Sequence, residues 1–307
     1  MENEARPDSI LPDPLPRNTL RIELPRNEGT TNSINRGMAA VPSPYVLLLN
    51  NDVELAPDYL QKLLVVLEAN ESLGFVTGKL LRASDHSLLE GAGDAMLLAG
   101  ASYRLGTLIR TAASTTNPCR FFRPAERPCS IARGHFCCRV RLMPTSSLIW
   151  TTSPSALRVN LLGYRGAYVP GAVAHHVGSA TLGQSLHPCV IEYITRNQFF
   201  VLWKDYSAAV FRRLLPRIVF YQMLWFLYVV KHGRLSAYVR GIRGAIRLRK
   251  RMKQKHHELM SKRTLDDEQL LERMKISERQ VYEWHCSQQT AKQSSLLKVY
   301  FRVFKPV

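Results

Sequence analysis

A short apolar run, Tyr45–Leu49, followed directly by Asn-Asn-Asp, constrains the fold of this chain more than any other segment. A run of this length that is apolar throughout is typical of a buried strand in the middle of a parallel sheet. Pro57 then marks a first helical turn, and leucines follow at helical spacing (Leu60, Leu63, Leu64 and Leu67). Ligands of open α/β sheets bind beyond the carboxyl ends of strands, so we expect Asp52 to lie at a ligand site.

The composition predicts a globular protein with an anionic partner. The chain has 307 residues, 46% of them hydrophobic, which is enough for one large domain or two small ones. Its 42 Lys and Arg against 24 Asp and Glu give a net charge of +18, which favours nucleic acid, an acidic membrane surface or a phosphorylated substrate. We find no zinc-ligand spacing and no signal-peptide pattern, so we expect a location in the cytoplasm or on the cytoplasmic face of the membrane.

The N-terminal part lacks a strong pattern. Residues 1–19 carry four prolines and no apolar periodicity, which predicts an extended or disordered arm. The alternation in Leu20–Leu24 predicts a strand, and Ser33–Ala40 is a plausible helix. Two Asn-x-Gly pairs lie here, ending at Gly29 and Gly37, and turn or cap formation explains these glycines as well as ligand contact does.

Several longer segments resemble the family 2 glycosyltransferases of the GT-A fold, especially bacterial members that build cell-surface polysaccharides. They are LLLNNDVELAPDYL, LGFVTGKLLRASD and LEGAGDAMLLAGASYRLG within residues 45–106, LRVNLLGYRGAYVPGAVAHHVGSATLG at 157–183, and RNQFFVLWKDY at 196–206. The resemblance implies an α/β, Rossmann-like GT-A core. The core is incomplete, because the first strand and helix and the second strand, which hold the nucleotide base in relatives, have no counterpart here.

The same resemblance gives the Asn-Asn-Asp triplet a role in binding a nucleotide-sugar donor. It implies that Asp52 holds a divalent cation, Mg²⁺ or Mn²⁺, which in turn holds the donor diphosphate, with Asn50 and Asn51 near the sugar or ribose. It also places further candidates against the nucleotide: Asn27, Gly29, Asn35 and Gly37. A hard cation of this kind takes one or two carboxylates plus substrate phosphates. The alternative is an ordinary polar turn, since Asn and Asp are common in turns.

Downstream, the resemblance implies a second metal or diphosphate ligand. His176 is the best match, His175 the second, and Ser179 a candidate on the phosphate side. A neutral imidazole is a competent ligand beside a carboxylate. Arg196, followed by Asn197, resembles the family's positioning pair. The alternatives are a histidine pair satisfied at a strand end and an arginine that is simply solvated at a helix start.

The window between Gly106 and Leu157 has an unusual composition. It holds seven arginines, one acidic residue (Glu126) and four of the six cysteines, and it follows neither helical nor strand periodicity. A basic linker has such a composition, and so does a coding sequence translated out of frame.

The out-of-frame hypothesis can be examined with the genetic code. Codons compatible with residues 146–154, read one nucleotide earlier, allow Phe-Phe-Ala-Tyr-Leu-Asp-Asp-Val-Ala, which resembles the family segment that carries the catalytic base. The same shift gives family-like residues at 125–132 and 107–111. We therefore hypothesise a paired frameshift that enters near Gly106 and leaves near Arg158. The expected acidic pair then reads Thr151-Thr152, and a threonine hydroxyl is a poor general base.

The C-terminal third predicts contact with an anionic membrane. Residues 214–230 are apolar and aromatic, but at 17 residues they reach only the lower limit for crossing a bilayer, so an in-plane helix is favoured. Residues 240–257 carry eight Lys and Arg and no acid. The alternative is a core helix followed by a solvated basic helix. A charged helix over 261–283 and a basic, aromatic tail complete the chain.

Five segments summarise the expected organisation: a disordered arm at 1–19, a partial GT-A core at 20–105, the aberrant window at 106–157, the end of the core at 158–206, and a helical, membrane-associated tail at 207–307. The resemblance implies sugar transfer from a nucleotide-sugar to a lipid-linked or polysaccharide acceptor, by a chain that lacks its base. The alternatives are a basic nucleic-acid-binding protein, for which no sequence signature is present, and a non-catalytic membrane-associated remnant.

Overall fold

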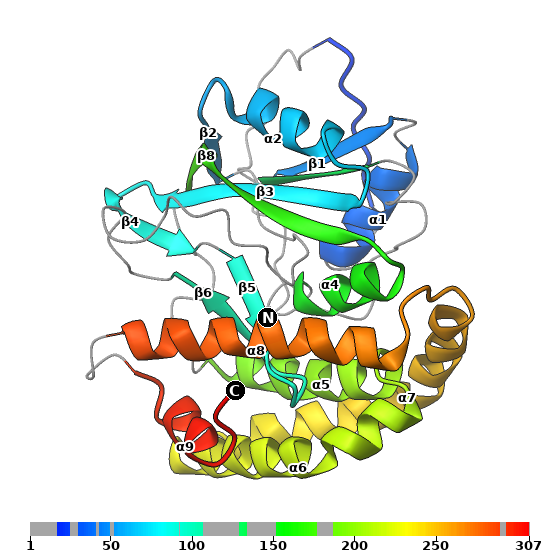
Figure 1. Ribbon diagram of the computed structural model, residues 1–307, viewed down its shortest axis with the longest axis vertical. Helices are drawn as coiled ribbons and strands as arrows, with labels where there is room; N and C mark the ends of the chain where they lie inside the picture. Colours follow the sequence, from blue (N-terminus) through cyan, green and yellow to red (C-terminus); the bar gives the residue numbers. More distant parts are fainter. Residues whose placement is uncertain are drawn as a thin grey trace.

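A mixed sheet and a layer of long helices make up the described part of the protein (Figure 1). The computed structural model describes residues 17–24, 30–40, 43–49, 52–91, 93–106, 129–133, 152–176, 187–288 and 293–306. In Figure 1 the large sheet lies above, the C-terminal helices lie below, and a short two-stranded sheet lies between them. The predicted α/β class with a helical C-terminal part is confirmed.

The large sheet combines antiparallel and parallel pairs. Its strands are β1 (Tyr45–Leu49), β2 (Val53–Leu55), β3 (Leu73–Arg82), β4 (Asp85–Gly91), β7 (Cys129–Arg133) and β8 (Arg165–His176). The order is β1-β7-β3-β8-β2, with β4 also paired to β3. The long strands β3 and β8 run parallel, whereas β7 is antiparallel to β1 and to β3. The small sheet pairs β5 (Gly93–Met96) with β6 (Ser102–Leu105).

Strand β1 forms as predicted but not in the middle of a parallel sheet. It lies at one end of the strand order, pairs antiparallel with β7, and is half-buried with Leu49 exposed. Its apolar composition has another cause. Val46 and Leu48 pack on helix α1 (Thr30–Ala40), while Tyr45 and Leu47 pack into the core beneath helix α2 (Tyr59–Glu68). Both faces are covered, so both need apolar residues.

The predicted strand at Leu20–Leu24 is wrong. These residues form no helix or strand, and Leu20 is 66% exposed. Alternation favours a strand only where a partner edge supplies the backbone hydrogen bonds. The helix predicted over Ser33–Ala40 is confirmed as α1, which starts slightly earlier.

Helix α2 covers one face of the sheet. Tyr59, Leu63 and Leu67 are fully buried over β3 and β8, as the leucine spacing predicted, although Leu60 is exposed. The helix approaches β3 so closely that the Gly78 N–H donates to the Tyr59 hydroxyl at 3.1 Å. A Cβ on Gly78 would lie 2.3 Å from the carbonyl oxygen of Ala172. Only glycine fits this contact, which holds α2 over the β3–β8 pair.

A glycine turn connects helix α4 (Thr152–Leu161) to β8. The Tyr164 N–H donates to the Val159 carbonyl at 3.1 Å, and the Gly163 N–H donates to the Asn160 carbonyl at 2.9 Å, with Gly163 at a φ of 88°. These bonds form a Schellman motif, which favours glycine at this position. The turn delivers the chain into β8 and therefore toward its last residue, His176.

Part of the window predicted to lack regular structure is regular. Residues 129–133 form β7, paired between β1 and β3, and α4 begins at Thr152. The low-order prediction is therefore wrong for these parts, and the rest of the window lies outside the described residues. Strand pairing uses backbone groups, so it can form without the side-chain alternation on which the prediction depended.

Five long or amphipathic helices form the C-terminal layer. They are α5 (Pro188–Lys204), α6 (Ala208–Lys231), α7 (Leu235–Met260), α8 (Asp267–Ser287) and α9 (Ser295–Val303). Helix α6 is longer than the apolar segment that predicted it. Helix α8 begins at Asp267, later than the predicted start at 261, because a cap precedes it.

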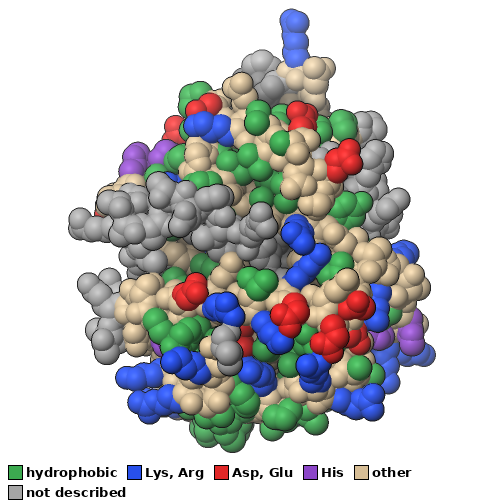
Figure 2. Space-filling model, viewed as in Figure 1, with side chains coloured by type: hydrophobic (Ala, Val, Ile, Leu, Met, Phe, Trp, Pro, Cys, Tyr) green, Lys and Arg blue, Asp and Glu red, His purple; other side chains and the backbone are tan. Residues whose placement is uncertain are grey.

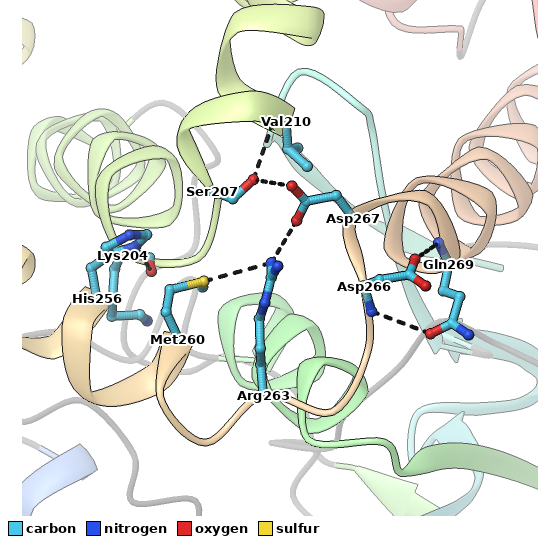
Figure 3. A network of polar contacts seen from close by, with 9 residues as sticks. All are labelled: Lys204, Ser207, Val210, His256, Met260, Arg263, Asp266, Asp267 and Gln269. Carbon is cyan, nitrogen blue, oxygen red and sulfur yellow. Dashed lines mark hydrogen bonds and ion pairs between the residues drawn. The ribbon is translucent and has the colours of Figure 1, made fainter.

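Side-chain caps tie the helix ends together (Figure 3). Ser207 caps α6 by accepting from the Val210 N–H at 3.1 Å, and its hydroxyl donates to Asp267 at 2.7 Å. Arg263 donates to the same carboxylate at 2.5 Å. Asp266 and Gln269 form a reciprocal capping box at the start of α8. These bonds satisfy the first N–H groups of both helices and fix the α5–α6 connection against the α7–α8 connection.

The small sheet lies between the large sheet and the helices, and α8 anchors it (Figure 1). Met96 and Leu98 donate their N–H groups to Ser277 and Glu278 of α8 at 2.7 and 3.1 Å. Glu278 is 1% exposed, and burial raises its pKa. Its carboxylate also accepts from the Tyr300 hydroxyl and from Arg217. The helical layer and the sheets thus share one polar connection inside an apolar core.

Candidate functional site

Asp52 and His176 meet at the end of the large sheet. Asp52 lies in the turn between β1 and β2, and His176 is the last residue of β8. Because β2 pairs antiparallel with β8, Val53 lies opposite His176 and brings the preceding Asp52 beside the imidazole. The Asp52 Oδ2 atom is 3.0 Å from the His176 Nε2 atom. Backbone pairing therefore joins two side chains that are far apart in the sequence.

Glu90 lies on the other side of the same imidazole. Its Oε2 atom, from β4, is 2.7 Å from His176 Nδ1. His176 is buried, and the hydrogen bond with Glu90 is the largest cause that raises its pKa, with Asp52 contributing in the same direction against the effect of burial. Each ring nitrogen thus faces a carboxylate. The Glu90 carboxylate fixes the orientation of the His176 ring, as carboxylates do for metal-binding histidines.

An arginine from the small sheet lies next to these groups. Arg104 of β6 approaches Glu90 at 3.9 Å and Asp94 at 4.0 Å. Both carboxylates are mostly buried, whereas Arg104 is about half exposed (54%). At such distances the arginine acts through its charge more than through a hydrogen bond. Figure 2 shows histidine side chains gathered at the left edge of the upper half, close to acidic and basic side chains.

The neighbouring His175 points away from this cluster. Successive residues of a strand face opposite sides of a sheet, and His175 lies opposite Glu54 of β2. Its ring packs against His86 with 4.3 Å between the centroids. His176, which the resemblance ranked first, is therefore the histidine that the fold places beside Asp52.

Arg196 lies elsewhere, in the helical layer. It is a residue of α5, its guanidinium lies over the rings of Tyr193 and Phe200, and its side chain packs against Gly244 of α7. Burial lowers its pKa. Its contacts are with this aromatic cluster and α7, not with Asp52, Glu90 or His176.

The remaining candidates are placed only in part. Asn35 and Gly37 lie in α1, which packs on β1. Thr152 is the first residue of α4. The others lie outside the described residues: Asn27, Gly29, Asn50, Asn51, Thr151 and Ser179.

The donor atoms at Asp52 and His176 fit part of a metal coordination sphere. Asp52 Oδ1 is buried and has no hydrogen-bond partner among the described residues. Asp52 Oδ2 and His176 Nε2 face each other at 3.0 Å. Within the same residues, no group of three or more His, Cys, Asp or Glu side chains could hold a metal ion. The two donors fit a cation whose other positions are filled by diphosphate oxygens and water.

Sequence reasoning missed Glu90. The residue belongs to the run at 89–106 that carries the family resemblance, and its only local signal is a single acid between Leu89 and Gly91, which are both buried. That signal indicates an inward-facing carboxylate but not its partner. The contact with His176 depends on β4 and β8 both pairing with β3.

The two elements that lead into the site carry no acidic side chain. The sequence has no Asp or Glu between Glu126 and Glu192, so α4 and β8 contain no carboxylate. Glu192 itself lies in α5 and binds Arg240 at 2.8 Å. These two elements therefore offer no carboxylate that could take a proton from an attacking hydroxyl.

Comparison with known proteins finds a family match in the N-terminal part of the chain. Residues 14–122 match the model of the family described as glycosyl transferase family 2. Among solved structures, the chain is similar to the crystal structure of GalNAc-T7 with UDP, GalNAc and Mn²⁺, at 14% identity and a TM-score of 0.46. The similarity covers 64% of this chain and 39% of that one, so this chain corresponds to well under half of that protein. No curated protein matches.

The family match confirms the resemblance to family 2 glycosyltransferases and moves its boundaries. It begins at residue 14, before the expected start near Leu20, and it extends to residue 122, inside the window of unusual composition. It ends before α4 and β8. Asp52 and Glu90 lie inside the matched range, and His176 joins them from outside it.

Proposed function

We propose that this chain, whose residues 14–122 match family 2 glycosyl transferases, is a GT-A glycosyltransferase that binds a nucleotide-sugar through a divalent cation. The donor sugar would be transferred to a lipid-linked or polysaccharide acceptor. The observation that supports this most strongly is the contact of Asp52 with His176 at 3.0 Å, at the carboxyl end of β8, which runs parallel to β3. The strand-end carboxylate and the histidine are the two residues that the resemblance had assigned to the cation.

Three side chains carry the donor chemistry in this proposal. Asp52 and His176 Nε2 would hold Mg²⁺ or Mn²⁺, and a cation there would supply positive charge against a departing diphosphate. Glu90 would accept a hydrogen bond from the His176 Nδ1–H group, which would leave the Nε2 lone pair directed at the cation site. Asp52 Oδ1, buried and without a described partner, is the second carboxylate oxygen available there. Asn35 and Gly37 remain candidates for nucleotide contact from α1.

We further propose that sugar transfer by this chain is impaired. Attack by an acceptor hydroxyl needs a carboxylate to take its proton. The family's acidic pair is expected where Thr151 and Thr152 stand, and α4 and β8 contain no acidic residue. Donor binding and catalysis are therefore separable here, since the first depends on Asp52 and His176 and the second on a missing group.

The acceptor is proposed from the location of the chain. Helix α6 is apolar, and α7 carries the basic stretch at 240–257. An enzyme held at the cytoplasmic face of the membrane by such a surface would meet lipid-linked acceptors directly. Nucleic acid is not expected as a partner.

The direct test is calorimetric titration with nucleoside diphosphates. Full-length protein is titrated with UDP, GDP and dTDP, each with Mn²⁺ and with a chelator. We expect weak binding of at least one nucleotide that requires the metal, and Asp52→Ala should remove it. Asp58→Ala is the matched control, because Asp58 is an exposed acid in the same turn region that pairs with Lys62.

The outcomes are distinct. Equal binding with and without metal would contradict the role of Asp52. Binding of an oligonucleotide in preference to every nucleoside diphosphate would favour the nucleic-acid-binding alternative. Absence of all nucleotide binding by a well-folded chain would leave the non-catalytic remnant as the better description.

A further inference from the structure

Helix α6 has an inner face that belongs to the protein core. Its buried residues recur at helical spacing: Val210, Leu214, Ile218, Tyr221, Trp225 and Val229. They pack with the small sheet and with α8 and α9. Arg217, near the middle of the helix, binds the buried Glu278 at 2.8 Å, and the Trp225 indole donates to Thr195 at 3.0 Å.

The outer face of the same helix is apolar and exposed. Its large side chains are Leu215, Val219, Met223, Phe226, Leu227 and Val230, which we call the α6 outer face. Val219 is 58% and Leu227 is 54% exposed. These residues also recur at helical spacing and extend over about 22 Å of the axis. A contiguous apolar strip of this size on a soluble protein indicates a binding surface.

Basic residues border the strip at both ends. Arg212 and Arg213 are exposed before it, and Lys231 is exposed after it. Figure 2 shows the same arrangement along the lower edge of the molecule, where α6 lies: hydrophobic side chains with Lys and Arg on both sides. Apolar side chains between cationic ones match a lipid surface, in which acyl chains lie beneath anionic headgroups.

Helix α7 continues this pattern. The Phe226 and Tyr238 rings pack edge to face with 5.4 Å between centroids, so α7 begins beside the α6 outer face. Along one side of α7 the exposed residues change from apolar to basic: Leu235, Val239, Ile246, Lys250 and Lys253. The apolar half adds to the strip and the basic half adds charge next to it.

The packing of α6 in the fold favours a helix that lies on a membrane over one that crosses it. By length and composition, α6 is the one helix in the described residues that could cross a bilayer. A crossing helix is surrounded by lipid or by other membrane segments, whereas the inner face of α6 packs on the small sheet and on α8 and α9 and holds the Arg217–Glu278 ion pair. Spanning would expose these groups to hydrocarbon.

We infer that the α6 outer face, with the start of α7, is a docking surface that lies flat in the interface of an anionic membrane. The apolar strip enters the region just below the headgroups, and the basic residues of α6 and α7 bind the headgroups. The inference deepens the proposed function, because it brings a donor site to lipid-linked acceptors. It is tested without nucleotide, so its failure would leave the donor-binding proposal intact.

The test is flotation of the full chain with vesicles. Neutral vesicles contain phosphatidylcholine, and anionic vesicles also contain phosphatidylglycerol. We expect flotation with anionic vesicles that weakens in high salt, as the Debye length shortens. In the double variant Val219→Glu/Leu227→Glu, binding to anionic vesicles should fall at least tenfold. The matched control Val65→Glu/Ile276→Glu changes two equally exposed apolar residues on other helices, 60% and 52% exposed, and should float normally.

A second pair of variants isolates the charge. Lys250→Gln/Lys253→Gln should weaken binding to anionic vesicles by roughly five- to thirtyfold. Lys262→Gln/Lys275→Gln removes the same charge from exposed positions outside the α6 and α7 surface and should have a smaller effect. Equal loss in both pairs would show that net charge, rather than this surface, determines binding.

Three results would overturn the inference. Flotation that is indifferent to lipid charge and to the α6 variants would exclude this face as the docking surface. Resistance to extraction by alkaline carbonate would indicate a spanning helix. A stable dimer that becomes monomeric in Val219→Glu/Leu227→Glu, without vesicle binding by either form, would assign the strip to a second copy of the chain.

Discussion

The sheet end that carries Asp52 and the helical layer beneath it are built in different ways. At the sheet end, the side chains meet because β2, β4 and β8 pair across long stretches of sequence, and the cluster contains three carboxylates, one histidine and one arginine. In the helical layer, by contrast, caps and aromatic contacts fix each helix locally, and the ends of neighbouring helices are bonded to one another.

The helical layer therefore contributes mainly to stability, whereas the sheet end carries the groups suited to binding a ligand. The helical layer holds most of the large buried aromatic side chains, including Tyr221, Trp225, Tyr300 and Phe301. The sheet end has a buried histidine whose two nitrogens face acids, and a carboxylate oxygen without a described partner. Groups of that kind cost folding free energy, and they are expected where a ligand supplies the missing interaction.

The largest expected effect concerns catalysis at the sheet end. A version of the chain with residues 107–157 translated in the neighbouring frame would regain the Asp-Asp pair in place of Thr151-Thr152. We expect it to hydrolyse or transfer from a nucleotide-sugar about 10²- to 10⁴-fold faster than the present chain, the contribution typical of a general base. Product formation by both versions is the measurement, with Asp52→Ala in the repaired version as the control.

Two findings would refute the frameshift hypothesis. One is a coding sequence whose codons cannot give Phe-Phe-Ala-Tyr-Leu-Asp-Asp-Val in the neighbouring frame. The other is efficient transfer by the chain as it stands. The rate of the repaired version is compared with that of the present chain.

The next effect concerns stability in the helical layer. Glu278→Leu should lower the free energy of unfolding by about 3–5 kcal/mol, because it leaves Arg217 without its partner in a largely buried position. Denaturant unfolding measures the loss. Glu283→Leu, at an exposed position of the same helix, should change stability by less than about 0.5 kcal/mol. Similar values for both variants would show that the buried ion pair does not join the helices to the small sheet.

A smaller effect is expected from Glu90→Gln at the sheet end. The amide can still accept from His176 Nδ1 but has no charge, so metal-dependent nucleotide affinity should fall about 10- to 100-fold while the fold is kept. Calorimetry measures the affinity, and the ¹⁵N shifts of the imidazole report its tautomer. Glu54→Gln is the control, since Glu54 lies opposite His175 on the other side of the strand. An unchanged tautomer and affinity would remove Glu90 from the site.

The two regions also differ in how far the sequence could predict them. Periodicity and turn residues predicted α1, α2 and the apolar helix α6, because these depend on local spacing. Local pattern did not reveal that β1 lies at one end of the strand order, that Leu20–Leu24 forms no strand, or that β7 inserts between β1 and β3. Strand neighbours are determined by backbone pairing between segments that are far apart in the sequence, and the alternation of side chains within one segment does not predict its partner.

The candidate site follows the same rule. Asp52 and His176 were found through the family resemblance, and the fold brings them together. Glu90 was not found, because its partner is determined by two strand pairings with β3. His175 and His176 are neighbours in the sequence, and the pleat of β8 is what separates their surroundings.

The most direct test of the account is to locate the metal. Crystals of the full chain grown with Mn²⁺ and the nucleoside diphosphate that binds best would be measured at the manganese absorption edge. We predict one anomalous peak within coordination distance of Asp52 and His176 Nε2, with the diphosphate on its open side and Glu90 still bonded to His176 Nδ1. A nucleotide bound with no peak there, or a peak held by other residues while His176 stays bonded to Asp52, would contradict the central claim.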